Sequence, residues 1–282
     1  MPHKLTLSLL LLLVTLPAYA WTHGAAPPAG LTVNLLWDAS ALAAAQSFRD
    51  GCQDGANQLQ AAIKNVITVN IKVGADEING NPLVGGNVGD GIDLCNIGGG
   101  CFKTYSAIYA ALPTGSADQI SFKNALPNAN NLQGTTAFYV TSSVQKALGF
   151  ISPTAAAVDG AIGVASGFSQ VQMAGLCAHE LTHAMGREPS VAPWTFGRFT
   201  AASTWLLSGS CSASYLSVDG GVTKFADYDT SADCSDFLIN GVQDPGGNVS
   251  YDAFDAFWGV QSLSTLSTVD NRQIDIMGFN DH

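Results

Sequence analysis

The pattern of apolar and polar positions predicts alternating strands and helices in the first part of the chain. Apolar and polar residues alternate over 31–35 and, most regularly, over 67–73, which indicates strands with one buried face. Further strands are expected over 137–140 and 159–165. Helical spacing predicts four helices between these strands, over residues 41–63 (with Ser40 as the N-cap), 103–111, 117–125 and 143–148.

The helix predicted over residues 170–186 has the clearest boundaries. Ser169 is a favourable N-cap, and Gln172 three residues later completes a capping box. Gly186 can end the helix, and Pro189 prevents its continuation. We therefore expect a well-defined helix that ends near residue 186.

Two segments have little periodicity. Residues 80–100 are rich in glycine and are expected to form turns, and the chain beyond residue 189 is rich in Gly, Ser and Asp. In this second segment we expect a hairpin turn at 218–222 and a final helix over 269–277. The pattern predicts an α+β fold with a mixed sheet and an irregular C-terminal part.

The first 20 residues have the composition of a signal peptide. Lys4 precedes an apolar run over residues 5–16, and a small-residue cleavage site ends at Ala20. We expect a mature domain over 21–282, with subdomains of about 21–188 and 189–282, and no membrane segment after cleavage. The prediction is a secreted or periplasmic protein.

Composition narrows the function classes. The chain of 282 residues is 47% hydrophobic and only 12% charged, which excludes a disordered protein. Its formal net charge of −11 would repel phosphate backbones, so we expect no nucleic-acid partner.

Six cysteines follow the predicted leader, and an even number in an exported chain suggests disulfides. Cys95 and Cys101 flank a short flexible loop that can close. Cys211 with Cys234 is the next natural pair, which leaves Cys52 with Cys177. A zinc cluster of these cysteines is disfavoured because no C-x2-C spacing occurs.

The sequence His179-Glu180-Leu181-Thr182-His183 lies within the predicted helix 170–186. Residues four apart share one helix face, so both imidazoles can reach one zinc ion. Glu180 points to one side of this face and can accept a proton from a water that zinc acidifies. We predict a zinc site with Glu180 as the general base of hydrolysis.

The third zinc ligand is expected to be an Asp, a Tyr or Glu188, since Pro189 cannot bind a metal and no Glu follows Glu188. An aspartate is favoured because eight of them lie between residues 219 and 255. Asp233 is the first choice, followed by Asp236 and Asp219, and Glu188 itself stays open. An alternative is a structural Ca²⁺ bound by the acidic residues of the same region. These residues are Asp227, Asp229, Asp233 and Asp236.

A tetrahedral intermediate also needs a second stabilising group. The candidates are Tyr215, Tyr228, Tyr251 and Arg187.

The helix segment His179–Arg187 resembles zincin metallopeptidases, and more narrowly a family of exported bacterial HExxH-type metalloproteases whose motif helix also ends in Met-Gly-Arg. The similarity extends to several other segments, which are 159–163, 215–221, 233–237, 252–254 and 275–279. The resemblance implies a zincin-like or metzincin-like fold with a substrate cleft between two subdomains. It also implies that the strand near Ile162 is the edge to which an extended peptide adds. No sorting tag follows Phe279, which favours a freely secreted or periplasmic form.

The leading hypothesis is therefore a secreted zinc-dependent endopeptidase that acts on a protein or peptide substrate. One alternative is an exported surface protein that binds metal without catalysis. Another is a zinc hydrolase of a different amide bond, because the same zinc, water and Glu180 would serve both reactions.

Overall fold

A mixed four-stranded sheet forms the first layer of the computed structural model, which describes residues 30–95, 100–243, 249–250, 252–256 and 265–281. The predicted leader lies outside these residues. The strand order is β1-β2-β8-β5, with β1, β2 and β8 parallel and β5 antiparallel to β8. The bounds are β1 (Thr32–Trp37), β2 (Thr68–Ala75), β8 (Gly160–Val164) and β5 (Gly89–Asp93). The predicted strands over 31–35, 67–73 and 159–165 are confirmed.

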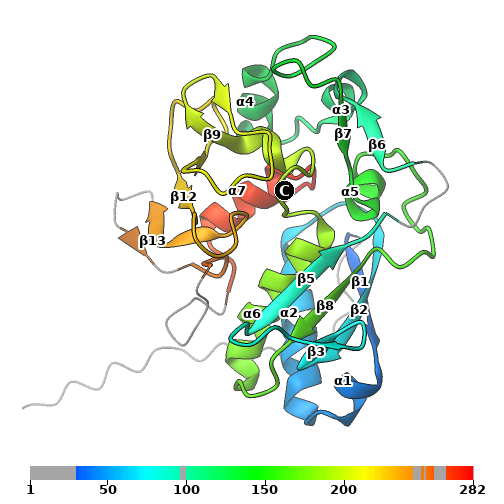
Figure 1. Ribbon diagram of the computed structural model, residues 1–282. Helices are drawn as coiled ribbons and strands as arrows, with labels where there is room; N and C mark the ends of the chain where they lie inside the picture. The colour runs from blue at the N-terminus through cyan, green and yellow to red at the C-terminus, as the bar shows by residue number, and fades with distance from the viewer. Residues whose placement is uncertain (1–29, 96–99, 244–248, 251, 257–264, 282) are drawn as a thin grey trace, which may run out of the picture.

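Two helices, α2 (Gln46–Ala62) and α6 (Gln170–Met185), pack against each other on one face of this sheet (Figure 1). Glycine makes the close approach possible, because a Cβ at Gly55 would lie 2.5 Å from the carbonyl oxygen of Ala174. The disulfide Cys52–Cys177 joins the two helices. Helix α6 is thereby fixed against both the sheet and α2.

The single helix predicted over 41–63 is wrong, because the chain forms α1 (Ala39–Ala43) and then α2. Asp38, rather than Ser40, caps α1 and accepts a hydrogen bond from the backbone N–H of Ala41 at 2.9 Å. The Arg49 side chain donates to the carbonyls of Ala41 and Ala44 at the end of α1. The Asp38 and Arg49 side chains thus provide hydrogen-bond partners for backbone N–H and C=O groups that lack a helical partner where the chain breaks between α1 and α2.

Two smaller units lie outside the first sheet (Figure 1). The hairpin β3–β4 lies beside β8, whereas the antiparallel pair β6–β7 and three short helices lie in another part of the molecule. The predicted helices near 103–111, 117–125 and 143–148 are present, although the first begins at 105 because 102–104 form a strand. The bounds are β3 (Glu77–Ile78), β4 (Asn81–Pro82), β6 (Phe102–Thr104), α3 (Tyr105–Ala111), α4 (Ala117–Ala125), β7 (Ala137–Tyr139) and α5 (Ser142–Ala147).

The C-terminal part is more regular than predicted. It forms a six-stranded antiparallel sheet with the order β10-β9-β11-β12-β13-β14. Most of these strands are too short to produce a detectable alternation of residue types. The bounds are β9 (Arg198–Ala201), β10 (Thr204–Trp205), β11 (Tyr215–Leu216), β12 (Ala226–Tyr228), β13 (Phe237–Gln243) and β14 (Val249–Ser250).

The turn predicted at 218–222 does connect an antiparallel pair, β11 and β12. A 3-10 helix, η1 (Trp194–Gly197), and the final helix α7 (Thr268–Ile276) complete this part. The α+β class with mixed sheets is confirmed. The subdomain boundary near residue 188 stays a prediction.

Two expectations about the first sheet are wrong. Residues 89–93 of the glycine-rich segment form β5 instead of turns, because Gly89 and Gly91 leave room for α6 to lie against the strand. The strand near Ile162 is β8, which pairs with β2 on one side and β5 on the other. The edge of the sheet is therefore β5.

All three predicted disulfides are present, Cys52–Cys177, Cys95–Cys101 and Cys211–Cys234. Among the described helices, none is both long and apolar enough to cross a membrane.

Candidate metal centre

Helix α6 carries the three residues of the predicted motif. Its capping box is present as predicted, with Ser169 accepting from the N–H of Gln172, and Gly186 ends the helix with a φ of 122°. His179 and His183 lie on the same helix face, with ring centroids 4.9 Å apart. The metal-binding atoms of His179, Glu180 and His183 all lie within 4.8 Å of one another.

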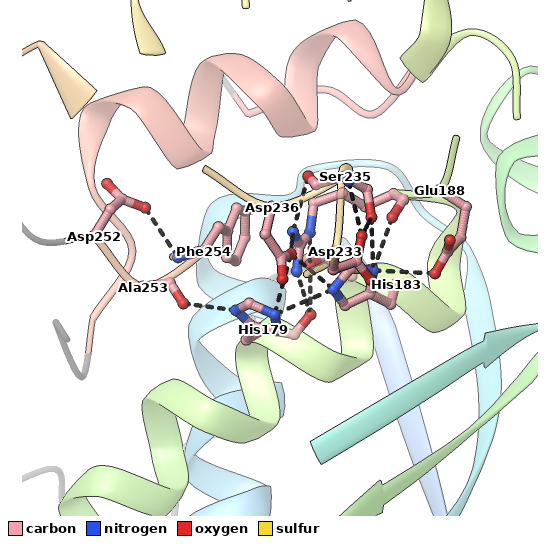
Figure 2. A network of polar contacts seen from close by, with 11 residues as sticks. His179, His183, Glu188, Asp233, Ser235, Asp236, Asp252, Ala253 and Phe254 are labelled. Carbon is pink, nitrogen blue, oxygen red and sulfur yellow. Dashed lines mark hydrogen bonds and ion pairs between the residues drawn. The ribbon is translucent and has the colours of Figure 1, made fainter. Parts of the chain in front are cut away.

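The two imidazoles and one carboxylate converge at a single point (Figure 2). The Nε2 atoms of His179 and His183 are 3.1 Å apart. Oδ1 of Asp236 lies 3.2 Å from Nε2 of His179 and 2.9 Å from Nε2 of His183. Asp236 directly precedes β13 of the C-terminal sheet, so the centre contains residues from both parts of the chain.

The other ring nitrogen of each histidine is held by a backbone carbonyl. Nδ1 of His179 lies 2.8 Å from the oxygen of Ala253, and Nδ1 of His183 lies 2.9 Å from the oxygen of Arg187. A carbonyl can only accept, so each Nδ1 carries the proton and each Nε2 presents a lone pair. Histidines that bind a metal are oriented in this way.

This donor set fits a zinc ion. Ligands at about 2.0–2.1 Å from a tetrahedral ion stand about 3.3 Å from one another. The three separations given above, between 2.9 and 3.2 Å, are close to that value. Two lone pairs and a carboxylate oxygen repel one another unless a cation lies between them. The cluster can therefore hold a metal ion.

Arg187 fixes Asp236 from the side away from the cleft. Its guanidinium is fully buried and contacts Oδ1 of Asp236, and it donates to the carbonyls of Ser235 and His179 and to Oγ1 of Thr182. Burial raises the pKa of Asp236, but in the metal-free protein positive charge on His179, when it takes up a proton, and on Arg187 outweighs burial and holds this pKa well below its usual range. Asp236 is thus kept as a carboxylate.

Glu180 lies beside the histidine pair and is 5% exposed. Burial raises the pKa of its carboxyl group to about 7, against the opposing charges of His179 and His183. Gly89 of β5 lies above it, and any side chain at this position would overlap the carboxylate. The strand therefore fixes the space in which Glu180 can move.

A cleft of about 840 Å³ opens on this centre. One wall is the segment Gly86–Asp93, which includes β5, and the other is formed by Ala232, Asp233, Cys234, Asp236 and Ala256. The acidic residues Asp90, Asp93, Glu188 and Asp233 line it in addition to Glu180 and Asp236. Sequence reasoning missed Asp90 and Asp93, since the glycines around them indicated turns.

The structure separates the three aspartates that were considered as third ligand. Asp236 reaches both Nε2 atoms, whereas Asp233 lies nearby and accepts hydrogen bonds from the N–H and hydroxyl of Ser235. Asp219 caps its own loop and accepts from Ser217, Val222 and Thr223. Asp236, the second choice, is thus in direct contact with both histidines, whereas the ligand atoms of Asp233, the first choice, lie within 4.8 Å of those of His183 and Asp236. The choice between these two aspartates as third ligand stays a prediction.

The four aspartates considered for calcium do not gather at one point. Asp227 pairs with Lys224, and Asp229 accepts from the N–H groups of Ser231 and Ala232. Asp236 instead faces the histidines.

None of the described candidates for the second stabilising group lines the cleft. The Tyr215 hydroxyl donates to Gly221, Tyr228 is buried against Trp194, and Arg187 lies behind Asp236. Tyr251 lies outside the described residues.

Comparison with protein-family models, with curated proteins and with solved structures finds no match for this chain.

Proposed function

We propose that this chain is an exported zinc-dependent endopeptidase with a zincin-like fold. The observation that carries the proposal is the convergence of His179 Nε2, His183 Nε2 and Asp236 Oδ1, with both Nδ1 atoms held by carbonyls. Glu180 adjoins this donor set inside a cleft. A metal site with a neighbouring buried carboxylate is suited to hydrolysis.

The residues have separate roles in this proposal. His179, His183 and Asp236 would hold zinc, which when bound polarises a carbonyl and acidifies water. Glu180 accepts a proton from the attacking water and returns it to the leaving amine. Glu180 is suited to both steps by its position, because its carboxylate is buried in the cleft directly beside the histidine pair.

The edge strand β5 supports a peptide as the substrate. It pairs with β8 alone within the described sheet, so its outer N–H and C=O groups face the cleft side. An extended peptide can add to such an edge by main-chain hydrogen bonds, which do not depend on its side chains. This arrangement would place a backbone amide of the substrate beside Glu180.

Export is supported by the three disulfides, which persist in oxidising compartments. The predicted leader over residues 1–20 agrees with a secreted or periplasmic protein.

The test compares the mature wild type with Glu180→Gln on casein and on a mixed peptide library. We expect cleavage by the wild type, a loss of at least about 1,000-fold in the variant, and one zinc per chain in both. Equal cleavage by the two proteins would refute the role of Glu180. Zinc binding with no cleavage of any substrate would instead favour the metal-binding surface protein.

A further inference from the structure

The two histidines of the metal centre differ in the partners of their outer ring nitrogen, Nδ1. Nδ1 of His179 lies 2.8 Å from the oxygen of Ala253, which is a neutral acceptor. Nδ1 of His183 lies 2.9 Å from the oxygen of Arg187 and also 3.1 Å from Oε1 of Glu188. Within the described residues, only His183 therefore has a carboxylate in contact with this nitrogen.

The end of α6 brings Glu188 back to His183. Gly186 ends the helix with a φ of 122°. The N–H of Gly186 donates to the carbonyl of His183 and the N–H of Arg187 to that of Thr182, both at 2.9 Å, which is the Schellman pattern of a glycine terminator. This turn reverses the chain over the last helical residues, so that Glu188 faces the imidazole of His183 (Figure 2).

The residues on either side of Glu188 fix its backbone. Arg187 is fully buried, and the ring of Pro189 restricts φ at the next position. The carbonyl of Glu188 accepts from the N–H of Val191 at 3.1 Å. The Glu188 side chain is 24% exposed and lines the cleft. Its contact with His183 joins two groups whose backbones are already held, which lowers the entropy lost when the contact forms.

Glu188 reaches the ring nitrogen that is directed away from the donor set. Nε2 of His183 faces Oδ1 of Asp236 at 2.9 Å and Nε2 of His179 at 3.1 Å. Oε1 of Glu188 lies instead at Nδ1, on the other side of the ring. Glu188 was an open choice for the third zinc ligand, but in this position it can act on a metal only through the imidazole of His183.

We propose that Glu188 is a positioning residue of the metal centre, which orients His183 and makes its Nε2 a stronger donor to zinc. This inference rests on the zinc site of the proposed function. A hydrogen bond from an imidazole N–H to a carboxylate is charge-assisted and stronger than one to a carbonyl. It leaves more electron density on the opposite ring nitrogen. The carbonyl of Arg187 is sufficient to fix the tautomer, so the specific contribution of Glu188 is its negative charge.

The test measures the Kd for zinc of the full mature chain by competition with a chromogenic chelator. This quantity does not depend on peptidase activity. Glu188→Gln keeps an acceptor oxygen but removes the charge, and it should raise the Kd about tenfold or more.

Asp90→Asn is the matched control. It removes one negative charge from the same cleft, but no described hydrogen bond or ion pair joins Asp90 to either histidine. The Kd for zinc should then change less than about threefold, because solvent screens a charge without direct contact.

Glu188→Asp provides the converse comparison. It keeps the charge in the cleft but shortens the side chain by one methylene group, so that the carboxylate is withdrawn from Nδ1 of His183. The Kd should therefore rise as it does in Glu188→Gln. This variant also decides the question if Glu188→Gln does not fold.

Two further measurements separate positioning from a purely structural role. In the cobalt-substituted protein, the visible absorption bands should shift in Glu188→Gln and not in Asp90→Asn, because a weaker histidine donor changes the ligand field of the metal. The urea midpoint of metal-free Glu188→Gln should equal that of the wild type, since the substitution is conservative and the side chain is partly exposed. A structural role would lower this midpoint and leave the zinc Kd unchanged.

The outcomes distinguish this proposal from the proposed function. A wild-type Kd in Glu188→Gln or Glu188→Asp, or equal changes in Glu188→Gln and Asp90→Asn, would overturn the role of Glu188 and leave the zinc site in place. A wild-type chain that binds no zinc would overturn both proposals. Zinc binding without peptide cleavage would refute only the activity, because the Kd values would still decide the role of Glu188.

Discussion

A methyl group at Gly89 would lie 2.1 Å from Oε1 of Glu180, so the backbone of β5 packs directly against the carboxylate of the proposed general base. This contact predicts that Gly89→Ala displaces the carboxylate. We expect a loss of about 100-fold in kcat/KM, because a shift of about 1 Å in a catalytic group has an effect of this order. Zinc content should not change, since the three atoms nearest to an added methyl group all belong to Glu180.

The matched control for this prediction is Gly85→Ala. Gly85 precedes the same strand, and a Cβ there would meet no atom within 4 Å. Equal activity of the two variants would show that the contact between Gly89 and Glu180 does not matter.

The position of Asp236 predicts an order of metal affinities. Asp236→Asn should raise the Kd for zinc about 100-fold or more, since it removes the negative charge that faces both Nε2 atoms. Asp233→Asn should change this Kd less than about tenfold, because Asp233 mainly orients Ser235. Competition with a chromogenic chelator measures both constants. The reverse order would return the third ligand to Asp233.

Arg187 should be important for stability rather than for the chemical step. Arg187→Met leaves the carboxylate of Asp236 without its buried partner, and breaking a buried ion pair costs about 3–5 kcal/mol. Lys224→Met breaks the exposed pair with Asp227 and should cost less than about 1 kcal/mol. Urea unfolding of the metal-free proteins gives both values, and similar values would contradict this role.

The disulfides should differ in their contribution to stability. Cys52 and Cys177 are 125 residues apart, whereas Cys95 and Cys101 are 6 apart. The entropy of loop closure then predicts losses of about 5 and about 2 kcal/mol when each bond is replaced by an alanine pair. Thermal unfolding of the two double variants measures the difference. A smaller loss for Cys52–Cys177 would indicate that packing of α2 on α6 holds the helices without the bond.

The acidic lining of the cleft predicts a preference for basic peptides. Asp90, Asp93, Glu188 and Asp233 attract lysine and arginine side chains and repel glutamate. We expect kcat/KM to be at least about tenfold higher for lysine-containing peptides than for their glutamate counterparts, and the ratio should fall as salt is added. A ratio near one at low salt would show that these carboxylates do not face the substrate.

Local signals in the sequence were sufficient for the motif helix. Ser169, Gln172 and Gly186 act within one turn of the helix ends, so residue type alone indicates where α6 begins and ends. The disulfide pairs could also be predicted, because loop length and elimination leave few choices. Ser40 shows the limit of this approach, since Asp38 two residues earlier is a stronger acceptor for the helix N–H groups.

Contacts between distant segments could not be predicted in the same way. Asp236 reaches the histidines because Arg187, 49 residues earlier in the chain, holds it there, and no spacing rule connects the two. Strand β5 was missed because glycine usually indicates a turn. Here the glycines instead leave room for α6 to pack against the strand, and this packing cannot be recognised from the sequence of the strand itself. The role of the Ala253 carbonyl is likewise invisible in sequence, since every residue has a carbonyl.

The exposed edge of β5 also affects how the protein behaves at high concentration. A free strand edge can pair with the edge of another molecule and so begin aggregation. Strand β5 has only five residues, two of which are aspartates and two glycines, and its one large apolar residue is Ile92. Negative charge would make two such edges repel each other. The same strand can therefore stay open to a peptide without promoting self-association of the chain.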